Sequence, residues 1–183
     1  MSGREERVVF RRARPEDARA IATVHVETWR TAYRGLMSDA FLADLDTQRR
    51  ERFWREETAA TDDRRPWVAD VNGVVVALAA AGPARDDDAP PTAGEVYLIY
   101  VLEQTAGQGL GHELLRRVEA DLSARGHATA LLWVLRDNAV ARRFYERHGW
   151  QRDGAEKSRT FGDRELVEVR YRKPLAASSD EKR

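Results

Sequence analysis

The segment EVYLIYVLEQTAGQGLGHELLRRV, residues 95–118, decides the fold, because a strand pattern changes into a helix pattern within it. Residues 95–102 are rich in β-branched and aromatic side chains, which predicts a strand, whereas apolar residues recur at helical spacing from Leu110 onward. Between the two stand Gly107, Gly109 and Gly111. Glycine tolerates unusual backbone angles and a helix N-terminus attracts anions, so this loop predicts backbone N–H groups that hold a phosphorylated ligand.

The next elements place this loop in a larger unit. The helix is expected to stop at Gly126, and residues 128–135 form an almost continuous apolar run, typical of a strand covered on both faces. Strand, helix and buried strand together predict a right-handed βαβ unit. The glycine loop then lies at the carboxyl end of the first strand, where α/β sheets bind ligands.

The rest of the chain supplies strands and helices on both sides of this unit. Asn72-Gly73 predicts a tight hairpin turn, while residues 85–94 lack an apolar period and predict an exposed connection, with a lid as the less favoured alternative. Expected strands cover residues 8–10, 67–71, 74–80, 154–161 and 165–172, and expected helices cover residues 14–35, 47–58 and 139–148.

Composition limits both the fold and the chemistry. The 183 residues suit a single domain, expected over residues 1–175, with a flexible tail at 176–183. Lysine plus arginine equals aspartate plus glutamate, 31 each, which disfavours nucleic acid as a partner. The chain has no cysteine and its four histidines lack metal-ligand spacing, so no metal is expected. No run suits a membrane span and the charged start differs from a signal peptide, so we expect a cytoplasmic protein without membrane contact.

Two familiar phosphate-binding motifs do not fit the loop. A P-loop requires Lys-Ser or Lys-Thr after its last glycine, where this chain has His112-Glu113. A dinucleotide-binding loop has the spacing GxGxxG and an acidic residue about twenty positions later. Here the spacing is GxGxG and the region from Thr129 to Trp133 is apolar. The loop therefore predicts neither a nucleoside triphosphatase nor a dinucleotide-dependent dehydrogenase.

Four signals instead occur in order: the strand 95–101, the glycine loop, Asn138, and the segment ARRFYERHGW at 141–150. In this order the sequence resembles the GNAT superfamily of acetyl-CoA-dependent N-acetyltransferases. That family has the loop pattern Arg/Gln-x-x-Gly-x-Gly/Ala and a later motif close to Asn-x-x-Ala-x-x-Phe-Tyr-x-x-x-Gly-Phe. The resemblance spans about Arg11 to Tyr171. It implies an α/β (α+β) fold with a mixed, twisted sheet of six to seven strands, flanked by about four helices and splayed between residues 95–101 and 128–135.

The resemblance also implies which residues bind acetyl-CoA, the expected cosubstrate. Backbone groups at the strand end would pair with the pantetheine arm, and they belong to Ile99, Tyr100 and Val101. The pyrophosphate would lie on the loop and helix start, which comprise Gly107, Gln108, Gly109, Leu110, Gly111 and His112. Asn138 would contact the cofactor arm through its amide, and it also suits a helix N-cap.

Acetyl transfer from a thioester to a primary amine requires two proton transfers. The resemblance places Tyr145 near the thioester sulfur, where its hydroxyl would protonate the departing thiolate; the alternative is an ordinary core aromatic residue. Glu95 matches the glutamate that acts as general base in some family members, and the alternative is a solvated residue at a strand start. A strand N–H would polarise the carbonyl. The expected reaction is direct attack in a ternary complex, without an acyl-enzyme.

The acceptor is the least determined part of this prediction. Trp29 and Tyr33 follow His25 at helical spacing and are candidates for the acceptor pocket, although such a stripe is more often core. Peptides, polyamines, antibiotics and small metabolite amines all stay open as acceptors, and a homodimer is compatible with the fold. Ala106 replaces the usual Arg or Gln, and Glu103 a frequent proline. These departures keep a non-catalytic acyl-CoA-binding sensor open as the alternative function.

Overall fold

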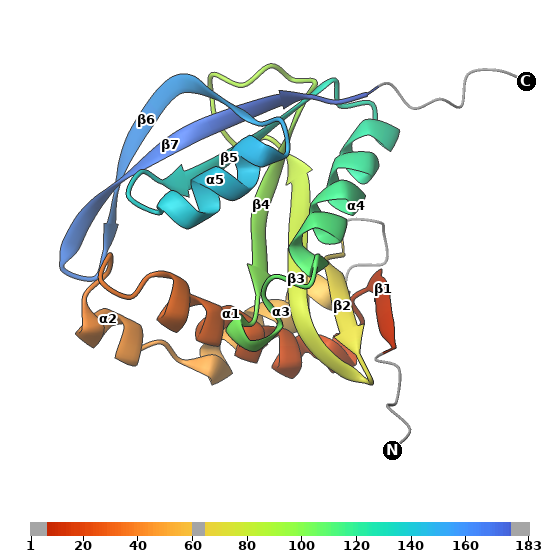
Figure 1. The fold of residues 1–183 in the computed structure, drawn as a ribbon, viewed down its shortest axis with the longest axis vertical. Coiled ribbons are helices and arrows are strands. Elements are labelled where there is room, and N and C mark those ends of the chain that lie inside the picture. Colours follow the sequence, from red (N-terminus) through yellow and green to blue (C-terminus); the bar gives the residue numbers. More distant parts are fainter. Residues whose placement is uncertain (1–6, 60–64, 177–183) are drawn as a thin grey trace, which may run out of the picture. The chain divides into compact units, whose positions relative to one another are not determined.

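Seven strands and five α-helices form in the residues that the computed structural model describes, 7–59 and 65–176 (Figure 1). The strands are β1 (Val8–Arg12), β2 (Trp67–Val71), β3 (Val74–Pro83), β4 (Ala93–Val101), β5 (Thr129–Leu135), β6 (Gln151–Phe161) and β7 (Arg164–Pro174). The helices are α1 (Ala18–Ala32), α2 (Asp39–Ala43), α3 (Thr47–Ala59), α4 (Leu110–Ala124) and α5 (Ala139–Arg147), with short 3-10 turns at Pro15–Asp17 and Glu103–Thr105.

The strands join in one mixed sheet with the order β1-β2-β3-β4-β5-β7-β6, as the α/β prediction requires. The chain divides into two compact units. The first unit contains residues up to 28, 46–80 and 98–117, and the second contains 29–45, 81–97 and 118 onward. A single domain over residues 1–175 stays a prediction, and nearly all of the expected tail lies outside the described residues.

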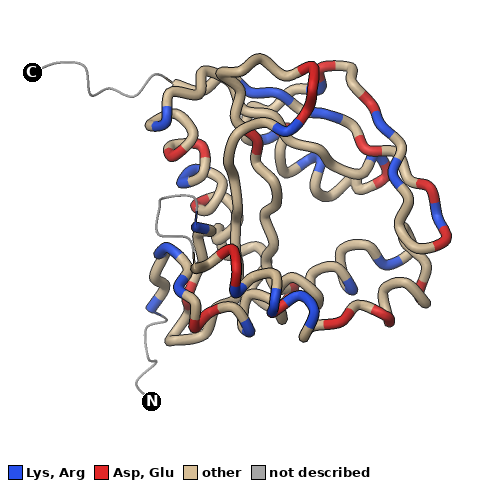
Figure 2. Tube along the Cα trace, turned by 180° about the vertical axis from the view of Figure 1, so that it is seen from behind, with Lys and Arg blue, Asp and Glu red and all other residues tan. Residues whose placement is uncertain are grey.

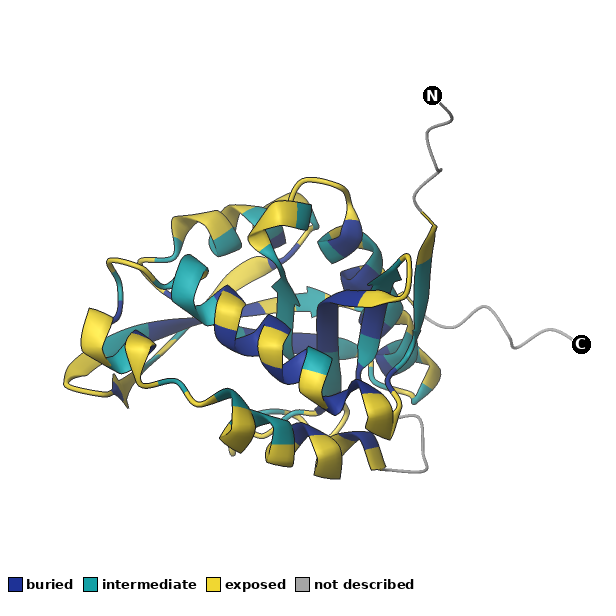
Figure 3. Cartoon of the chain, turned by 90° about the horizontal axis from the view of Figure 1, so that it is seen from below, coloured by how far each residue is buried: buried dark blue, intermediate teal, exposed yellow. Residues whose placement is uncertain are grey.

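The first unit is built on antiparallel strands covered by helices. β1 pairs with β2, and β2 with β3 around the Asn72-Gly73 turn. Both turn residues have positive φ, 54° and 88°, which confirms the predicted hairpin. Apolar residues of α1 and α3 pack on the strands, with fully buried Ile21, Trp54 and Leu78 at the centre. Figure 3 colours buried positions of the chain dark blue. The apolar period of α1 therefore faces a core, as helical spacing predicts.

The second unit contains the predicted βαβ strand pair. β4 and β5 are parallel and pair through Ala93 to Glu95 with Thr129 to Leu131. Their ladder covers three residues, although β4 has nine and β5 seven, which agrees with the expected splay. β5 also pairs with β7 and is buried at five of its seven positions, as its continuous apolar run predicted.

Several boundaries and one helix differ from the sequence-based expectation. β6 begins at Gln151 instead of residue 154. A bulge between Arg152 and Glu156 interrupts its pairing with β7, so the start of the strand lacks the regular alternation by which a strand is predicted. β3 continues to Pro83. The five-residue helix α2 was not predicted, since so short a segment shows no helical period; Ser38 caps it by accepting a hydrogen bond from the Phe41 N–H at 3.3 Å.

Candidate functional site

The glycine loop leads from β4 into α4 in the first unit, at the place predicted. Gly107 and Gly109 have φ of 80° and 81°, a region that other residues rarely adopt. An added Cβ at either position would meet nothing within 4 Å, so backbone angles rather than close packing require glycine here. Gly111, the third glycine of this segment, lies inside the first turn of α4. Two of the three glycines therefore shape the loop.

The start of α4 presents backbone donors to this loop. The Glu113 N–H donates to the Gly109 carbonyl at 3.1 Å, the first bond of the helical ladder. The N–H groups of Leu110, Gly111 and His112 precede that bond, so the helix offers them no carbonyl four residues earlier. Together with the helix dipole, these N–H groups favour an anion at this end of α4.

The direction of the backbone groups at the end of β4 distinguishes Tyr100 from its neighbours Ile99 and Val101, the three residues predicted to contact the pantetheine arm. The Leu102 N–H donates to the Val76 carbonyl on β3 at 3.0 Å. Backbone groups alternate along a strand, so Tyr100 also directs its N–H and carbonyl toward β3. By the same alternation, we expect the backbone groups of Ile99 and Val101 to face away from β3. The Val101 carbonyl accepts a hydrogen bond from the buried Thr28 hydroxyl at 3.4 Å, and this bond fixes the strand end to α1.

The Tyr100 side chain packs against the first-unit core. Its ring lies 4.8 Å from the His25 ring, centre to centre. His25 Nδ1 accepts a hydrogen bond from Trp54 Nε1 at 3.2 Å, which assigns the ring proton to Nε2. Burial, and to a lesser extent the positive charge of Arg50, lower the pKa of His25 from 6.5 to about 3. His25 is therefore neutral at physiological pH.

Helix α5 carries two predicted site residues in the second unit. Asn138 Oδ1 caps the helix by accepting a hydrogen bond from the Ala141 N–H at 3.0 Å. Within the described residues, the Asn138 side-chain nitrogen forms no hydrogen bond, so it is available as a donor. Tyr145 lies about two turns later and is buried, with its ring 5.2 Å from Phe144 and 6.1 Å from Trp150.

Glu95 occupies a different setting from the solvated strand start that was its alternative interpretation. Its side chain is only 5% exposed, and both oxygens bind Arg85. Oε1 accepts from Nη2 at 2.6 Å, and Oε2 accepts from Nε at 3.2 Å and from the Arg85 backbone N–H at 3.0 Å. The Arg85 guanidinium lies 4.0 Å above the Tyr97 ring. Both oxygens of the Glu95 carboxylate are thus engaged by one arginine, and this geometry favours a structural role for Glu95.

Trp29 and Tyr33 pack in an aromatic cluster of the second unit. Their rings are 5.1 Å apart, and Trp29 also contacts Phe41 on α2 and Phe161 at the end of β6. Around them lie Leu36, Met37, Leu42, Leu45, Leu135 and Leu166. This packing favours the core interpretation, and acceptor contact by Trp29 and Tyr33 stays a prediction. His25, one turn earlier on α1, contacts Trp54 and Tyr100 instead.

The loop before β4 is fixed by ion pairs that sequence reasoning missed. Arg170 of β7, with a side chain only 7% exposed, binds Asp86 at 3.1 Å, Asp88 at 2.7 Å and Asp153 at 2.7 Å. Trp133, opposite Arg170 on β5, donates from Nε1 to Asp86 at 2.8 Å. Figure 2 colours aspartate and glutamate red, including those of the loop between β3 and β4. The loop is therefore held to the sheet by Trp133 and Arg170, which are 47 and 84 positions from Asp86, and no local pattern in the sequence could indicate these contacts.

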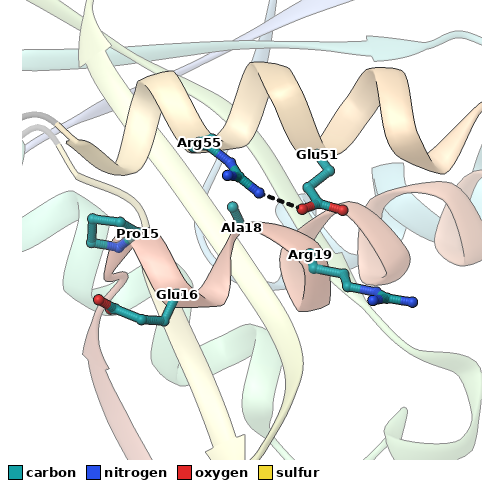
Figure 4. Close-up of a pocket in the computed structure, with 6 residues that line it drawn as sticks. All are labelled: Pro15, Glu16, Ala18, Arg19, Glu51 and Arg55. Atoms are coloured by element: carbon teal, nitrogen blue, oxygen red, sulfur yellow. Dashed lines mark hydrogen bonds and ion pairs between the residues drawn. The ribbon is translucent and has the colours of Figure 1, made fainter.

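A shallow depression of about 290 Å³ lies between the start of α1 and α3 in the first unit. Figure 4 shows Glu51 and Arg55 projecting from α3 toward α1, joined by an ion pair of 2.7 Å. Glu16 and Arg19 complete its charged lining. Acids and bases balance here, so the depression does not present one dominant charge.

Within residues 7–59 and 65–176, no group of three or more His, Asp or Glu side chains is arranged to hold a metal ion. No helix among these residues is long and apolar enough to cross a membrane.

Known proteins share this sequence pattern and fold. A sequence profile described as the acetyltransferase (GNAT) family matches residues 16–150. The chain is 33% identical over 132 residues to the uncharacterized N-acetyltransferase YuaI of Bacillus subtilis, covering 72% of this chain and 73% of that protein. It is 30% identical over 156 residues to the probable N-acetyltransferase Rv2775 of Mycobacterium tuberculosis, covering 83% and 82%. The PaiA N-acetyltransferase from Thermoplasma acidophilum, solved in complex with coenzyme A, shares the fold with a TM-score of 0.73 at 16% identity, covering 92% of this chain and 99% of that one.

Proposed function

The chain belongs to the acetyltransferase (GNAT) family, and on that basis we propose that it transfers an acetyl group from acetyl-CoA to a primary amine. The amine attacks the thioester directly in a ternary complex, and no covalent acyl-enzyme forms. The observation that carries this proposal is the loop between β4 and α4, where two glycines with positive φ lead directly into the first turn of a helix.

The glycine loop is the proposed pyrophosphate site. The space around Gly107 and Gly109 is open, and the N–H groups of Leu110, Gly111 and His112 follow directly in the chain. A diphosphate carries negative charge and several acceptor oxygens, which match these donors and the positive end of α4. The cradle uses backbone atoms, so Ala106 in place of Arg or Gln removes one side-chain contact and leaves the cradle itself in place.

The pantetheine arm is assigned to backbone and amide groups. Ile99 and Val101 direct backbone groups away from β3, and an amide-containing arm can pair with such groups as an added strand would. The Asn138 side-chain nitrogen adds a donor while Oδ1 caps α5. The cap holds that donor in one orientation, so a single residue serves both the helix and the cofactor.

The chemistry requires the carbon–sulfur bond to break as the carbon–nitrogen bond forms. The neutral amine attacks the thioester carbonyl carbon, and the proton it then loses passes to water. We assign Tyr145 as the acid that protonates the departing thiolate and then regains a proton from water, a role that suits a buried phenol on α5. The Arg85 pair argues against Glu95 as the base, so we assign Glu95 to holding the loop before β4.

The test is release of CoA thiol with a broad amine library, compared between the wild type and Tyr145→Phe. We expect a fall in kcat of about a hundredfold or more with little change in the KM for acetyl-CoA, since proton transfer typically contributes that factor. Tyr171→Phe is the matched control, because its hydroxyl binds Glu146 and Arg142 and should affect stability alone. CoA binding without turnover of any amine would overturn the proposal and support the acyl-CoA sensor.

A further inference from the structure

Arg50 lies on the side of α3 that faces the first-unit core. Arg50, Trp54 and Thr58 are spaced four residues apart, which places them on one side of a helix. Trp54 is 2% and Thr58 1% exposed, and Arg50 is half-buried, whereas its neighbours Arg49 and Arg52 are exposed. A cation on the core-facing side of a helix has lost part of its hydration and needs compensation.

Within the described residues, that compensation does not come from a carboxylate. Arg50 forms no ion pair there, and its contact is with the Phe53 ring, 5.8 Å from the guanidinium carbon. Other arginines of the first unit are paired: Arg11 binds Asp17 at 2.6 Å, and Arg55 binds Glu51 at 2.7 Å. Successive residues of a helix are about 100° apart, so Arg50 and Glu51 lie on opposite sides of the buried stripe of α3. Glu51 therefore does not neutralise the charge of Arg50.

The groups that act electrostatically on Arg50 are aromatic, neutral or of like charge. Its charge acts on His25, which is uncharged, and on Tyr100 of β4. Burial lowers the pKa of Arg50, Tyr100 opposes this effect, and Arg49 adds to it. The guanidinium remains charged at physiological pH because its pKa starts far above 7. Arg50 is thus a positive charge in partly apolar surroundings, beside the β4 segment to which the acyl arm is assigned.

From this arrangement we propose that Arg50 is an anion-binding residue of the acceptor site and that the acceptor is an amine carrying a carboxylate. The inference rests on the proposed function and adds the acceptor's chemical class. A planar guanidinium offers paired donors that match a carboxylate, and such a pair is strongest where water is partly excluded. Tyr100 connects this residue to the reaction, because its neighbours Ile99 and Val101 are assigned to the pantetheine arm.

The experiment compares the standard α-amino acids with their carboxamides and decarboxylated amines. Wild type, Arg50→Ala and Arg50→Lys are assayed for CoA release, with Arg49→Ala as the matched control from the exposed side of the same helix. We expect wild type to prefer an acid over its uncharged counterparts. Arg50→Ala should raise the KM for that acid roughly ten- to hundredfold, the value of one hydrogen-bonded charge. Arg50→Lys should restore part of this loss, and the KM for acetyl-CoA should stay unchanged.

A second measurement separates this inference from the proposed function. The melting temperature of the CoA-saturated protein is recorded with each acid and each carboxamide, which requires no turnover. Acids that stabilise the wild type and Arg49→Ala, but not Arg50→Ala, support the anion site even if no amine is acetylated. Equal effects of acids on wild type and Arg50→Ala, no acid preference in the wild type, or a raised KM for acetyl-CoA in Arg50→Ala would overturn it.

Discussion

Gly109 and Gly126 stand just before and just after helix α4 and permit a matched test of the glycine loop. Their φ values are 81° and 84°, and an added Cβ would meet nothing within 4 Å at either position. Alanine therefore introduces only backbone strain, about 1–2 kcal/mol for an L-residue with left-handed angles. For a chain of this size, each kcal/mol lowers Tm by about 2–4 °C. Both Gly109→Ala and Gly126→Ala should show this loss of stability.

The two variants should differ in their affinity for CoA. Alanine at residue 109 disfavours the backbone angles that aim the N–H groups of the loop, while residue 126 is outside the proposed site. Losing one hydrogen bond to a charged group costs about 1.5–3 kcal/mol, so Gly109→Ala should weaken CoA binding roughly tenfold or more. Isothermal titration calorimetry with CoA measures this difference. An unchanged Kd in Gly109→Ala, or an equal loss in Gly126→Ala, would refute the assignment of the loop.

Three other substitutions test single contacts. Asn138→Asp should keep the α5 cap and its stability but raise the KM for acetyl-CoA, whereas Asn138→Ala should also lose about 1 kcal/mol of unfolding free energy, measured by urea denaturation. Glu95→Gln and Arg85→Gln should each lower stability with little change in the pH dependence of kcat; loss of the low-pH fall in kcat for Glu95→Gln alone would restore Glu95 as the base. Arg170→Met should lower the unfolding free energy by about 3 kcal/mol, because it leaves Asp86 and Asp153 without their buried partner. Hydrogen bonds from Arg170 lower the pKa of Asp88 in the folded protein. The stability that this carboxylate contributes is therefore fully present above its unfolded pKa and is lost as the pH falls through its folded pKa. Stability measured from pH 6 to pH 2 should no longer show this pH-dependent part in Arg170→Met.

Local patterns predicted most of the fold because the periods were long or the turn chemistry was specific. β5 is recognisable from its unbroken apolar run, and the β2–β3 hairpin from Asn72-Gly73, which needs positive φ at both residues. Helix α2 escaped prediction because its five residues cannot display a period of 3.6. The bulge in β6 likewise appears only when the partner strand is known.

The candidate site was predictable where it depends on backbone and not where it depends on distant charge pairs. The glycine loop and the Asn138 cap use residues close in sequence, so their types and spacing are informative. The partner of Glu95 could not be identified, because Arg85 lies in a segment whose composition indicates only an exposed connection. Strand alternation distinguishes Ile99 and Val101 from Tyr100 only after the pairing with β3 is known.

The contact of Arg170 with Asp86 and Asp88 also has a consequence for how this chain can change over evolutionary time. Loss of the arginine alone would leave several carboxylates close together, and loss of the carboxylates would leave a buried cation, so either step by itself is penalised. Residues 86, 88 and 170 should therefore be conserved together or replaced together. Relatives with an apolar residue at position 170 are expected to have replaced the acidic loop as well, a pattern of paired substitution that aligned sequences can reveal.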